Sequence, residues 1–253
     1  LHGERRSNRT GVDTLSMFGL STRYDLRDGF PLWTTKKVHW PSAFIEMLWF
    51  LQGNPDMTFL NEHHVTIWDE WVKADGTIGP GYGHQWRRWA GYGGQEHDQI
   101  SQLINGLKND PYGRRHLVSA WNVEDLDKMA LPPCHYAFQC YVSQKGDLDL
   151  LLNQRSADLF LGVPFNVAGY ALLLMMLAQC TGLTPRRLIH NLGDAHIYVN
   201  HIEQVKTQLQ RVPRPVAKVM LRPDITDIDA FRPEHIMVKS YEPAPAIKAP
   251  VAV

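Results

Sequence analysis

The sequence has 253 residues, of which 44% are hydrophobic, and its 26 basic residues are balanced by 26 acidic ones. A chain of this length and composition can bury a substantial core, and its zero net charge gives no overall attraction to nucleic acid or to an anionic membrane. We expect that no apolar run approaches the length of a membrane span, and no signal-peptide pattern appears.

The three cysteines, Cys134, Cys140 and Cys180, show neither metal-binding nor redox spacing, which favours reduced thiols in a cytoplasmic protein. No Pro/Ser-rich linker or charged run divides the chain, so we expect a single domain over residues 1–253. The sequence starts at Leu1 without a methionine, and we therefore expect that an N-terminal piece is missing.

The first predicted elements are a basic, turn-prone loop over residues 5–11 and a strand over 14–25. A helix is predicted over 42–52 because Pro41 stands near its first turn and Gly53 just past its end.

The helix over 42–52 is apolar nearly all round, which predicts that it is buried. Glu46 stands in the middle of it, and a carboxylate in such surroundings has a raised pKa unless it is hydrogen-bonded. A raised pKa suits proton transfer at neutral pH. The alternative is a glutamate at the helix rim with its carboxylate in water, and the residues alone leave both interpretations open.

Aromatic residues are dense between residues 54 and 89, which is typical of a core or an interface. The glycines among them do not form a phosphate loop, because no Lys-Ser/Thr pair follows. The cations and rings of residues 84–89 would also fit a short single-strand nucleic-acid patch, which is a minor alternative.

Apolar spacing predicts a surface helix over 98–107, and a strand follows over 116–121. Arg114 and Arg115 immediately precede that strand, and paired arginines are most often solvated surface residues.

A hairpin is predicted next, with a polar turn over residues 144–147 between β-favouring segments. If Lys145 and Gly146 form a two-residue loop, Cys134 lies opposite residue 157 and diagonal to Arg155 on the same face. A fixed positive charge beside a thiol favours the thiolate, which is the nucleophilic form of cysteine. A slip of one residue would place the two side chains on opposite faces.

Asn166 directly precedes a long apolar helix predicted over 167–181, where it would serve as N-cap. Its side-chain donor and acceptor also match N3-H and O4 of uracil and mismatch cytosine, and both roles are compatible. His196 and Tyr198 alternate in a strand-like segment and so point the same way. Among the twelve histidines no cluster has metal-binding spacing, and we expect no metal.

Four ordered motifs closely resemble thymidylate synthase, and the similarity spans nearly the whole chain. They are Leu131-Pro132-Pro133-Cys134-His135, Gln154-Arg155-Ser156-Ala157-Asp158, Leu161-Gly162-Val163-Pro164-Phe165-Asn166 and Gly193-Asp194-Ala195-His196-Ile197-Tyr198. The resemblance implies an α/β (α+β) fold in which a sheet is packed by helices and forms the homodimer interface. It also implies a helix before the present start, and conversion of dUMP to dTMP with 5,10-methylenetetrahydrofolate as carbon donor and reductant.

For the nucleotide, the resemblance implies addition of Cys134 to the pyrimidine ring, proton transfer organised by Glu46, and Tyr82 near the reacting carbon. It implies that Arg155 stabilises the thiolate and binds phosphate. The remaining implied nucleotide contacts are phosphate binding by Arg9, Ser156 and the partner's Arg114 and Arg115, base recognition by Asn166 with Gln154 and Asp158, and 3′-hydroxyl binding by His196 and Tyr198.

For the folate, the resemblance implies a flat apolar wall, an aspartate that holds the pterin ring, and a lysine that attracts the glutamate tail. The carboxyl terminus is implied to close over the bound ligands, although a proline-rich end ordinarily frays. The implied folate contacts are Lys36, Ile67, Trp68, Trp71, Leu131, Asp158, Gly162, Phe165, Tyr198 and Ala252.

Three alternatives are weighed against this reaction. A dUMP or dCMP hydroxymethylase of the same fold would quench the methylene with water, but Trp68 and the intact carboxyl terminus favour a pocket that excludes water. A non-catalytic RNA-binding regulator is disfavoured by retention of the reactive residues. A cysteine hydrolase is disfavoured because His135 neighbours Cys134 on a strand and points to the other face.

The sequence departs from the commonest family pattern at a few positions around these motifs, none of which is catalytic. They leave open whether the surroundings of the pocket, and so the product, are altered. The positions are Gly113, Tyr136, Ala137, Asn153 and Gly169.

Overall fold

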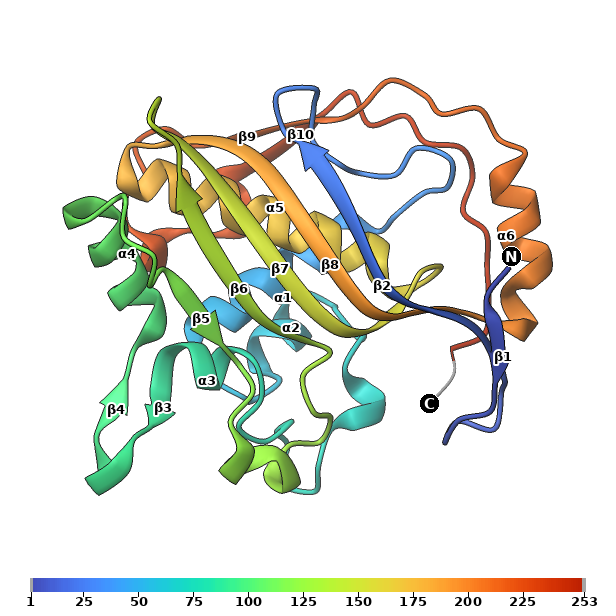
Figure 1. Ribbon diagram of the computed structural model, residues 1–253, viewed down its shortest axis with the longest axis horizontal. Coiled ribbons are helices and arrows are strands. Elements are labelled where there is room, and N and C mark those ends of the chain that lie inside the picture. Colours follow the sequence, from blue (N-terminus) through green and yellow to red (C-terminus); the bar gives the residue numbers. More distant parts are fainter. Residues whose placement is uncertain (1, 252–253) are drawn as a thin grey trace.

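Six strands form one mixed sheet in the order β1-β2-β8-β7-β6-β5 in the computed structural model, which describes residues 2–251 (Figure 1). Strands β7 and β8 pair in parallel, whereas the other neighbours pair antiparallel. The expected α/β class is therefore confirmed. The strand bounds are β1 Glu4–Arg6, β2 Thr14–Asp25, β5 Leu117–Ser119, β6 His135–Val142, β7 Asp147–Asp158 and β8 Thr184–Tyr198.

Two small two-stranded sheets complete the β-structure, one pairing β3 with β4 and the other pairing β9 with β10. Their bounds are β3 Trp89–Ala90, β4 Glu96–His97, β9 Lys218–Leu221 and β10 Ile236–Lys239. The predicted strands over 14–25 and 116–121 are both present, the second shorter than expected because only its central residues pair with β6.

Helix α5 connects the parallel strands β7 and β8 and packs against both, with α1 on its other side (Figure 1). By length and composition α5 could cross a membrane, but 78% of its apolar window is buried inside the protein. The expectation that no apolar run reaches membrane-spanning length is therefore wrong, and the run is a core helix. The helix bounds are α1 Trp40–Gln52, α2 Thr58–Glu62, α3 Gly83–Arg88, α4 Gln99–Asn109, α5 Gly162–Thr181 and α6 Ile202–Leu209.

Helices α1 and α5 approach each other closely at Gly169. A Cβ atom on this residue would come within 3.3 Å of Met47 Cε and 3.6 Å of the Ala43 carbonyl oxygen. The departure from the family pattern at Gly169 therefore removes an atom from a tight crossing inside the core, and Gly169 itself does not line the cavity described below.

Helix α5 begins at Gly162, four residues before Asn166, so the prediction that Asn166 caps the helix is wrong. Pro164 fits the first turn because the backbone N–H groups there have no partner within the helix. Asp158 Oδ1 instead accepts hydrogen bonds from the N–H groups of Phe160 and Leu161, at 2.9 and 3.2 Å. Asn166 is left inside the helix with its side chain free for another role.

The hairpin of β6 and β7 differs from the prediction in two ways. Each shifts the pairing by one residue, and the two together leave Cys134 on the same face as Arg155. Its loop has three residues, since Ser143 N–H donates to the Asp147 carbonyl at 2.8 Å and Gly146 adopts a φ of 78°. This longer loop alone would set Cys134 opposite Ser156. A bulge between His135 and Ala137 shifts the register once more.

Because of this second shift, the Arg155 N–H donates to the Cys134 carbonyl at 2.8 Å. Cys134 therefore lies directly opposite Arg155, rather than opposite residue 157 as predicted. Directly opposed residues of an antiparallel pair share a face, so the expected proximity survives through a different register.

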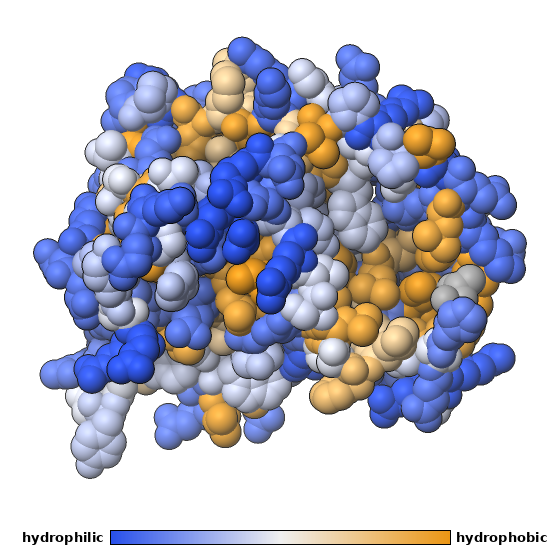
Figure 2. All heavy atoms as spheres, turned by 45° about the horizontal axis from the view of Figure 1, so that its top comes forward, coloured by the Kyte–Doolittle hydropathy of each residue, from blue (hydrophilic) through white to orange (hydrophobic). Residues whose placement is uncertain are grey.

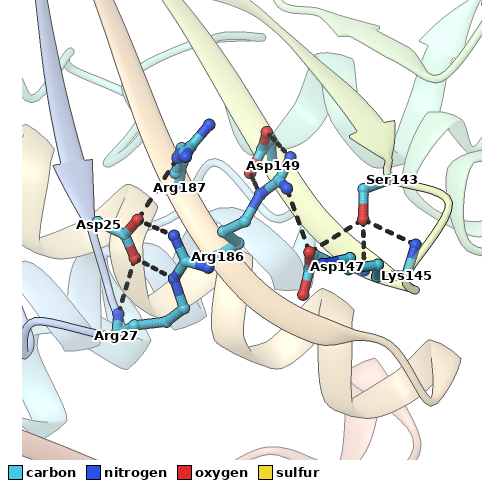
Figure 3. A network of polar contacts seen from close by, with 8 residues as sticks. All are labelled: Asp25, Arg27, Ser143, Lys145, Asp147, Asp149, Arg186 and Arg187. Carbon is cyan, nitrogen blue, oxygen red and sulfur yellow. Dashed lines mark hydrogen bonds and ion pairs between the residues drawn. The ribbon is translucent and has the colours of Figure 1, made fainter.

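A cluster of charged side chains lies where β7 and β8 begin and β2 ends (Figure 3). Arg186 donates to both carboxylate oxygens of Asp149 at 2.7 and 2.6 Å, and it reaches Asp147 at 3.1 Å. A bidentate guanidinium-carboxylate contact fixes geometry, so this cluster holds the parallel register. The carboxyl ends of β7 and β8 lie at the opposite end of the sheet, the end at which open α/β sheets commonly bind ligands.

Large apolar side chains of the sheet strands remain exposed in this chain. Phe18 of β2 is 86% exposed, Tyr141 of β6 is 63% exposed and Leu117 of β5 is 52% exposed. Figure 2 shows hydrophobic side chains reaching the surface among hydrophilic ones. The homodimer interface on this sheet stays a prediction.

Candidate active site

A cavity of about 940 Å³ lies at the carboxyl ends of β7 and β8 and is bordered by α1, the start of α5 and the carboxyl-terminal segment. The structure gathers most of the predicted site residues around it, although they come from distant parts of the sequence. The predicted residues that line it are Arg9, Glu46, Ile67, Trp68, Trp71, Tyr82, Leu131, Cys134, Gln154, Arg155, Ser156, Asp158, Gly162, Phe165, Asn166, His196 and Tyr198.

Arg155 is held rigidly beside Cys134. Its Nε and Nη2 donate to the carbonyl oxygens of Pro133 and Pro132 at 2.9 and 2.8 Å, and its guanidinium lies 5.4 Å from the centre of the Trp121 ring. These contacts tie β7 to the segment that carries the cysteine and leave Nη1 of the guanidinium for another anion or acceptor.

The thiol of Cys134 is half-buried at the cavity wall. Burial raises the pKa of this thiol above its ordinary value, while the nearby charges of Arg155 and Arg9 and a hydrogen bond from Tyr82 lower it. Burial is the larger effect. The charge of Arg155 thus acts in the expected direction, toward the thiolate, although burial outweighs it and the net pKa of the thiol is raised.

Tyr82 holds the other side of the Cys134 segment. Its hydroxyl accepts the Cys134 backbone N–H at 2.8 Å, and its ring stacks on Phe50 with centroids 4.8 Å apart. The backbone of Tyr82 has a φ of 32°, a strained conformation for a bulky residue that is typical of functional sites. Burial raises the pKa of the phenol well above its ordinary value, so Tyr82 remains a proton donor.

Glu46 lies half-buried in the cavity wall and accepts a hydrogen bond from Trp68 Nε1 at 2.7 Å. Burial raises the pKa of this carboxyl to about 7, and the hydrogen bond from Trp68 opposes the shift. The buried interpretation of Glu46 is therefore confirmed and the rim interpretation is wrong. A carboxyl that titrates near neutrality can both give and take a proton.

Asn166 and Gln154 meet at the wall between α5 and β7. Gln154 Nε2 donates to Asn166 Oδ1 at 3.1 Å and to the Ser156 carbonyl at 2.9 Å. Both side chains line the cavity, so an amide group is presented there in a fixed orientation.

His196 and Tyr198 lie side by side at the end of β8, with ring centres 5.3 Å apart, and both line the cavity as their alternation predicts. His135 is also in the wall, but burial lowers its pKa to about 3 and its Nδ1 lies 2.9 Å from the Tyr170 hydroxyl. A histidine held in this way is neutral and committed to Tyr170, which disfavours a role as catalytic base.

Three predicted residues are not brought to the cavity. Lys36 is 5% exposed, and its ammonium donates to the Phe160 carbonyl and lies 3.6 Å from the centre of that ring. Burial lowers the pKa of Lys36 to about 8. Lys36 is therefore held inside the protein and does not line the cavity, and its expected attraction for the folate tail stays a prediction. Arg114 and Arg115 are exposed and away from the cavity of their own chain.

The carboxyl-terminal segment over 240–251 is held against the molecule rather than frayed. Nε2 of the fully buried His201 lies 2.7 Å from the Pro250 carbonyl oxygen, and Val251 lines the cavity. This end therefore reaches the cavity as far as Val251, and its closure over bound ligands stays a prediction. Ala252 lies outside the described residues.

Sequence reasoning missed several residues of the cavity wall. Asn8 and Thr10 form a small turn in which Asn8 Oδ1 accepts from the Thr10 N–H at 2.9 Å and from its hydroxyl at 2.7 Å. Asp194 belongs to the motif over residues 193–198, and its Oδ1 lies 3.3 Å from His196 Nδ1. Its position two residues before His196 on a strand could have predicted that both side chains face the cavity.

The departures from the family pattern lie outside the cavity lining. Asn153 Oδ1 accepts from Asn191 Nδ2 at 3.1 Å within the sheet, and Tyr136 stands at the bulge. A Cβ on Gly113 would come within 2.6 Å of Asp110 Oδ2, so its turn excludes a side chain. None of these residues lines the cavity.

A thiol beside a fixed guanidinium, together with a carboxyl that titrates near neutrality in a large cavity, is the arrangement of an enzyme that acts covalently on a small anionic substrate. The chain belongs to the thymidylate synthase family, because the family model described as thymidylate synthase matches residues 1–253, its whole length. The family comprises methyltransferases that bind dUMP, use methylenetetrahydrofolate as co-substrate and are generally dimeric.

Proposed function

We propose that this chain, as a cytoplasmic homodimer, converts dUMP to dTMP and releases dihydrofolate. The observation that supports this most is the meeting of Cys134, Glu46 and Asn166 in one cavity. Together they supply a nucleophile, a group that transfers protons and an amide that can hydrogen-bond to the edge of the pyrimidine.

The nucleotide phosphate would lie at the basic end of the cavity. Arg9 and Ser156 line it, and Arg155 retains Nη1 for a further charge-assisted bond. His196 and Tyr198 would bind the sugar hydroxyl. This placement puts the pyrimidine between Cys134 and Asn166.

Cys134 would lose its proton and add through sulfur to C6 of the pyrimidine, which makes C5 a nucleophile. The bound phosphate and ring would have to shift the thiol toward its anion, and Arg155 and Tyr82 already lower its pKa. Methylenetetrahydrofolate supplies the carbon that C5 captures and then the hydride that reduces it, and leaves as dihydrofolate. Glu46 and Tyr82 would carry the proton that C5 loses, and departure of the sulfur from C6 restores the ring and frees Cys134.

The folate would fit the apolar side of the cavity. Trp68 and Trp71 provide a wall with ring centres 5.9 Å apart, and Ile67, Leu131 and Phe165 also line the cavity. Such a surface suits the flat rings of the co-substrate. The carboxylate of Asp158 uses Oδ1 to hold the start of α5 and would offer Oδ2 to the N–H groups of the pterin.

The proposal is tested by incubating the protein with dUMP and methylenetetrahydrofolate, following dihydrofolate absorbance and identifying the nucleotide by mass. Formation of dTMP with dihydrofolate is expected. Hydroxymethyl-dUMP with tetrahydrofolate would show the hydroxymethylase instead. Tight RNA binding that weakens steeply with salt, without nucleotide turnover, would favour the regulator.

We further propose that Arg115 completes the phosphate site of the partner chain. Cys134→Ala and Arg115→Ala are each expected to be inactive alone. Mixing the two with subunit exchange should restore about a quarter of the wild-type rate, because half of the dimers are then hybrids and each hybrid has one complete site.

The matched control for this mixing experiment pairs Cys134→Ala with Glu46→Gln. Both of these residues lie in the cavity of their own chain, so every hybrid dimer has one site without Cys134 and one without Glu46, and this mixture should not regain activity. If the Arg115 mixture stays inactive although mass spectrometry shows that hybrid dimers have formed, Arg115 lies outside the partner's site.

A further inference from the structure

A line of hydrogen bonds leads from the sheet to the cavity through His190, Gln154 and Asn166. His190 Nε2 lies 2.8 Å from Gln154 Oε1, and Gln154 Nε2 donates to Asn166 Oδ1 at 3.1 Å. His190 is fully buried on β8 and Gln154 is 3% exposed on β7, while Asn166 reaches the cavity from α5. His190 itself does not line the cavity, so it would act through the other two.

The Ser156 carbonyl determines which way the Gln154 amide faces. Gln154 Nε2 lies 2.9 Å from this oxygen, and a backbone carbonyl can only accept, so the NH₂ group must stand there. The same NH₂ group faces Asn166, which must therefore present Oδ1 to it. Asn166 then keeps its Nδ2 hydrogens for a ligand, and Oδ1 retains a second lone pair.

The amide oxygen of Gln154 consequently faces His190 and requires a donor there. Burial lowers the pKa of His190 to about 4, so the ring is neutral and carries a single N–H. That proton must be on Nε2. Nδ1 is then unprotonated, and among residues 2–251 it is buried without a hydrogen-bond partner.

We propose that His190 is a positioning residue that, through Gln154, fixes the Asn166 amide so that it donates to the carbonyl group at C4 of uracil and rejects the amino group of cytosine. The inference deepens the proposed function and rests on it. Without a donor at position 190, the Gln154 oxygen loses its partner, and only the bonds from the Gln154 NH₂ group to the Ser156 carbonyl and to Asn166 Oδ1 still oppose a turn of the amide. A turned Gln154 would let Asn166 present its oxygen to C4, which suits cytosine.

His190→Phe, which keeps a ring and removes the donor, tests this through the preference for dUMP over dCMP. Dissociation constants and kcat/KM are measured for both nucleotides. We expect the preference to fall by roughly tenfold to a hundredfold, chiefly through dUMP. His190→Gln, which restores an N–H donor, should recover most of it.

Cys140→Ala is the matched control, because Cys140 is 2% exposed on the neighbouring strand β6 and takes no part in the relay. It should lower stability and leave the preference unchanged. An unchanged preference in folded His190→Phe would overturn the proposal. If the wild-type protein binds neither nucleotide, the proposed function fails instead.

The tautomer of His190 can be read in the wild-type protein, which keeps the test independent of whether the variants fold. With ¹⁵N-labelled histidine, nitrogen shifts should show Nε2 protonated and Nδ1 unprotonated, and the His190 signals are assigned by their loss in His190→Gln or His190→Phe. A proton on Nδ1 would make Nε2 an acceptor and would contradict the relay.

Discussion

Replacing Cys134 with alanine is expected to lower dihydrofolate formation by at least about 10⁴-fold, because no other group around the cavity can add to C6 in its place. The substitution removes only the sulfur. The hydrogen bond from the Cys134 backbone N–H to the Tyr82 hydroxyl, at 2.8 Å, and the bond from the Arg155 N–H to its carbonyl both remain. The protein should therefore still fold and bind dUMP.

Turnover is followed by absorbance and dUMP binding by calorimetry on the same preparation. Cys180→Ala serves as control, since this cysteine lies near the end of α5, away from the cavity, and should keep wild-type turnover. Retention of full turnover by Cys134→Ala would refute covalent addition even if the product were dTMP.

Glu46→Gln is expected to reduce kcat by roughly 10² to 10⁴, the contribution typical of a positioned acid or base. Glutamine retains an oxygen that can accept the Trp68 Nε1 hydrogen bond, so the wall of the cavity should be preserved. It cannot ionise, and the proton that C5 must lose has no carrier at that position. Wild-type activity in this variant would assign the proton transfer to another group.

Glu46→Gln should lower activity, but it should raise the stability of the folded protein above neutral pH. The Glu46 carboxyl has a pKa of about 7 in the folded protein and 4.5 ordinarily, so the folded state holds the proton more tightly. Its stabilising contribution is complete below about pH 4.5 and is lost as the pH rises through about 7. Glutamine has no such loss.

The free energy of unfolding of Glu46→Gln, minus that of the wild type, should therefore rise by on the order of 2 kcal/mol between about pH 5 and about pH 8. Urea unfolding at the two pH values measures this difference. A stability difference that does not change with pH would show that Glu46 titrates normally and would remove it as the proton carrier.

The Glu46 and hairpin predictions show what local pattern can establish. A carboxyl in an apolar helix has few environments open to it, so the helix predicted burial with a raised pKa as one of two interpretations of Glu46, and the residues alone did not decide between them. The hairpin prediction placed Cys134 near Arg155 for an incomplete reason, since neither the longer loop nor the bulge at Tyr136 was foreseen. The two shifts of register add up to two residues, which keeps Cys134 and Arg155 on one face. Only this shared face was predictable.

The failures concern contacts made across the fold. Lys36 was expected at the folate site from the resemblance, but its partner, Phe160, is 124 residues away and no local pattern reveals it. Asn166 reads as a helix cap because it directly precedes a long apolar run, yet Asp158 supplies the capping bonds earlier in the chain. His190 gave no signal at all, since its role depends on Gln154 of the adjacent strand.

The addition of sulfur to C6 is tested most directly by hydrogen exchange at C5 of dUMP. In D₂O without folate, reversible addition by Cys134 makes C5 basic, so the wild-type protein should replace the C5 hydrogen of dUMP with deuterium, seen as a gain of one mass unit. Cys134→Ala, with dUMP bound, should not. Exchange that persists in Cys134→Ala, or its absence in wild-type protein that forms dTMP, would contradict the mechanism.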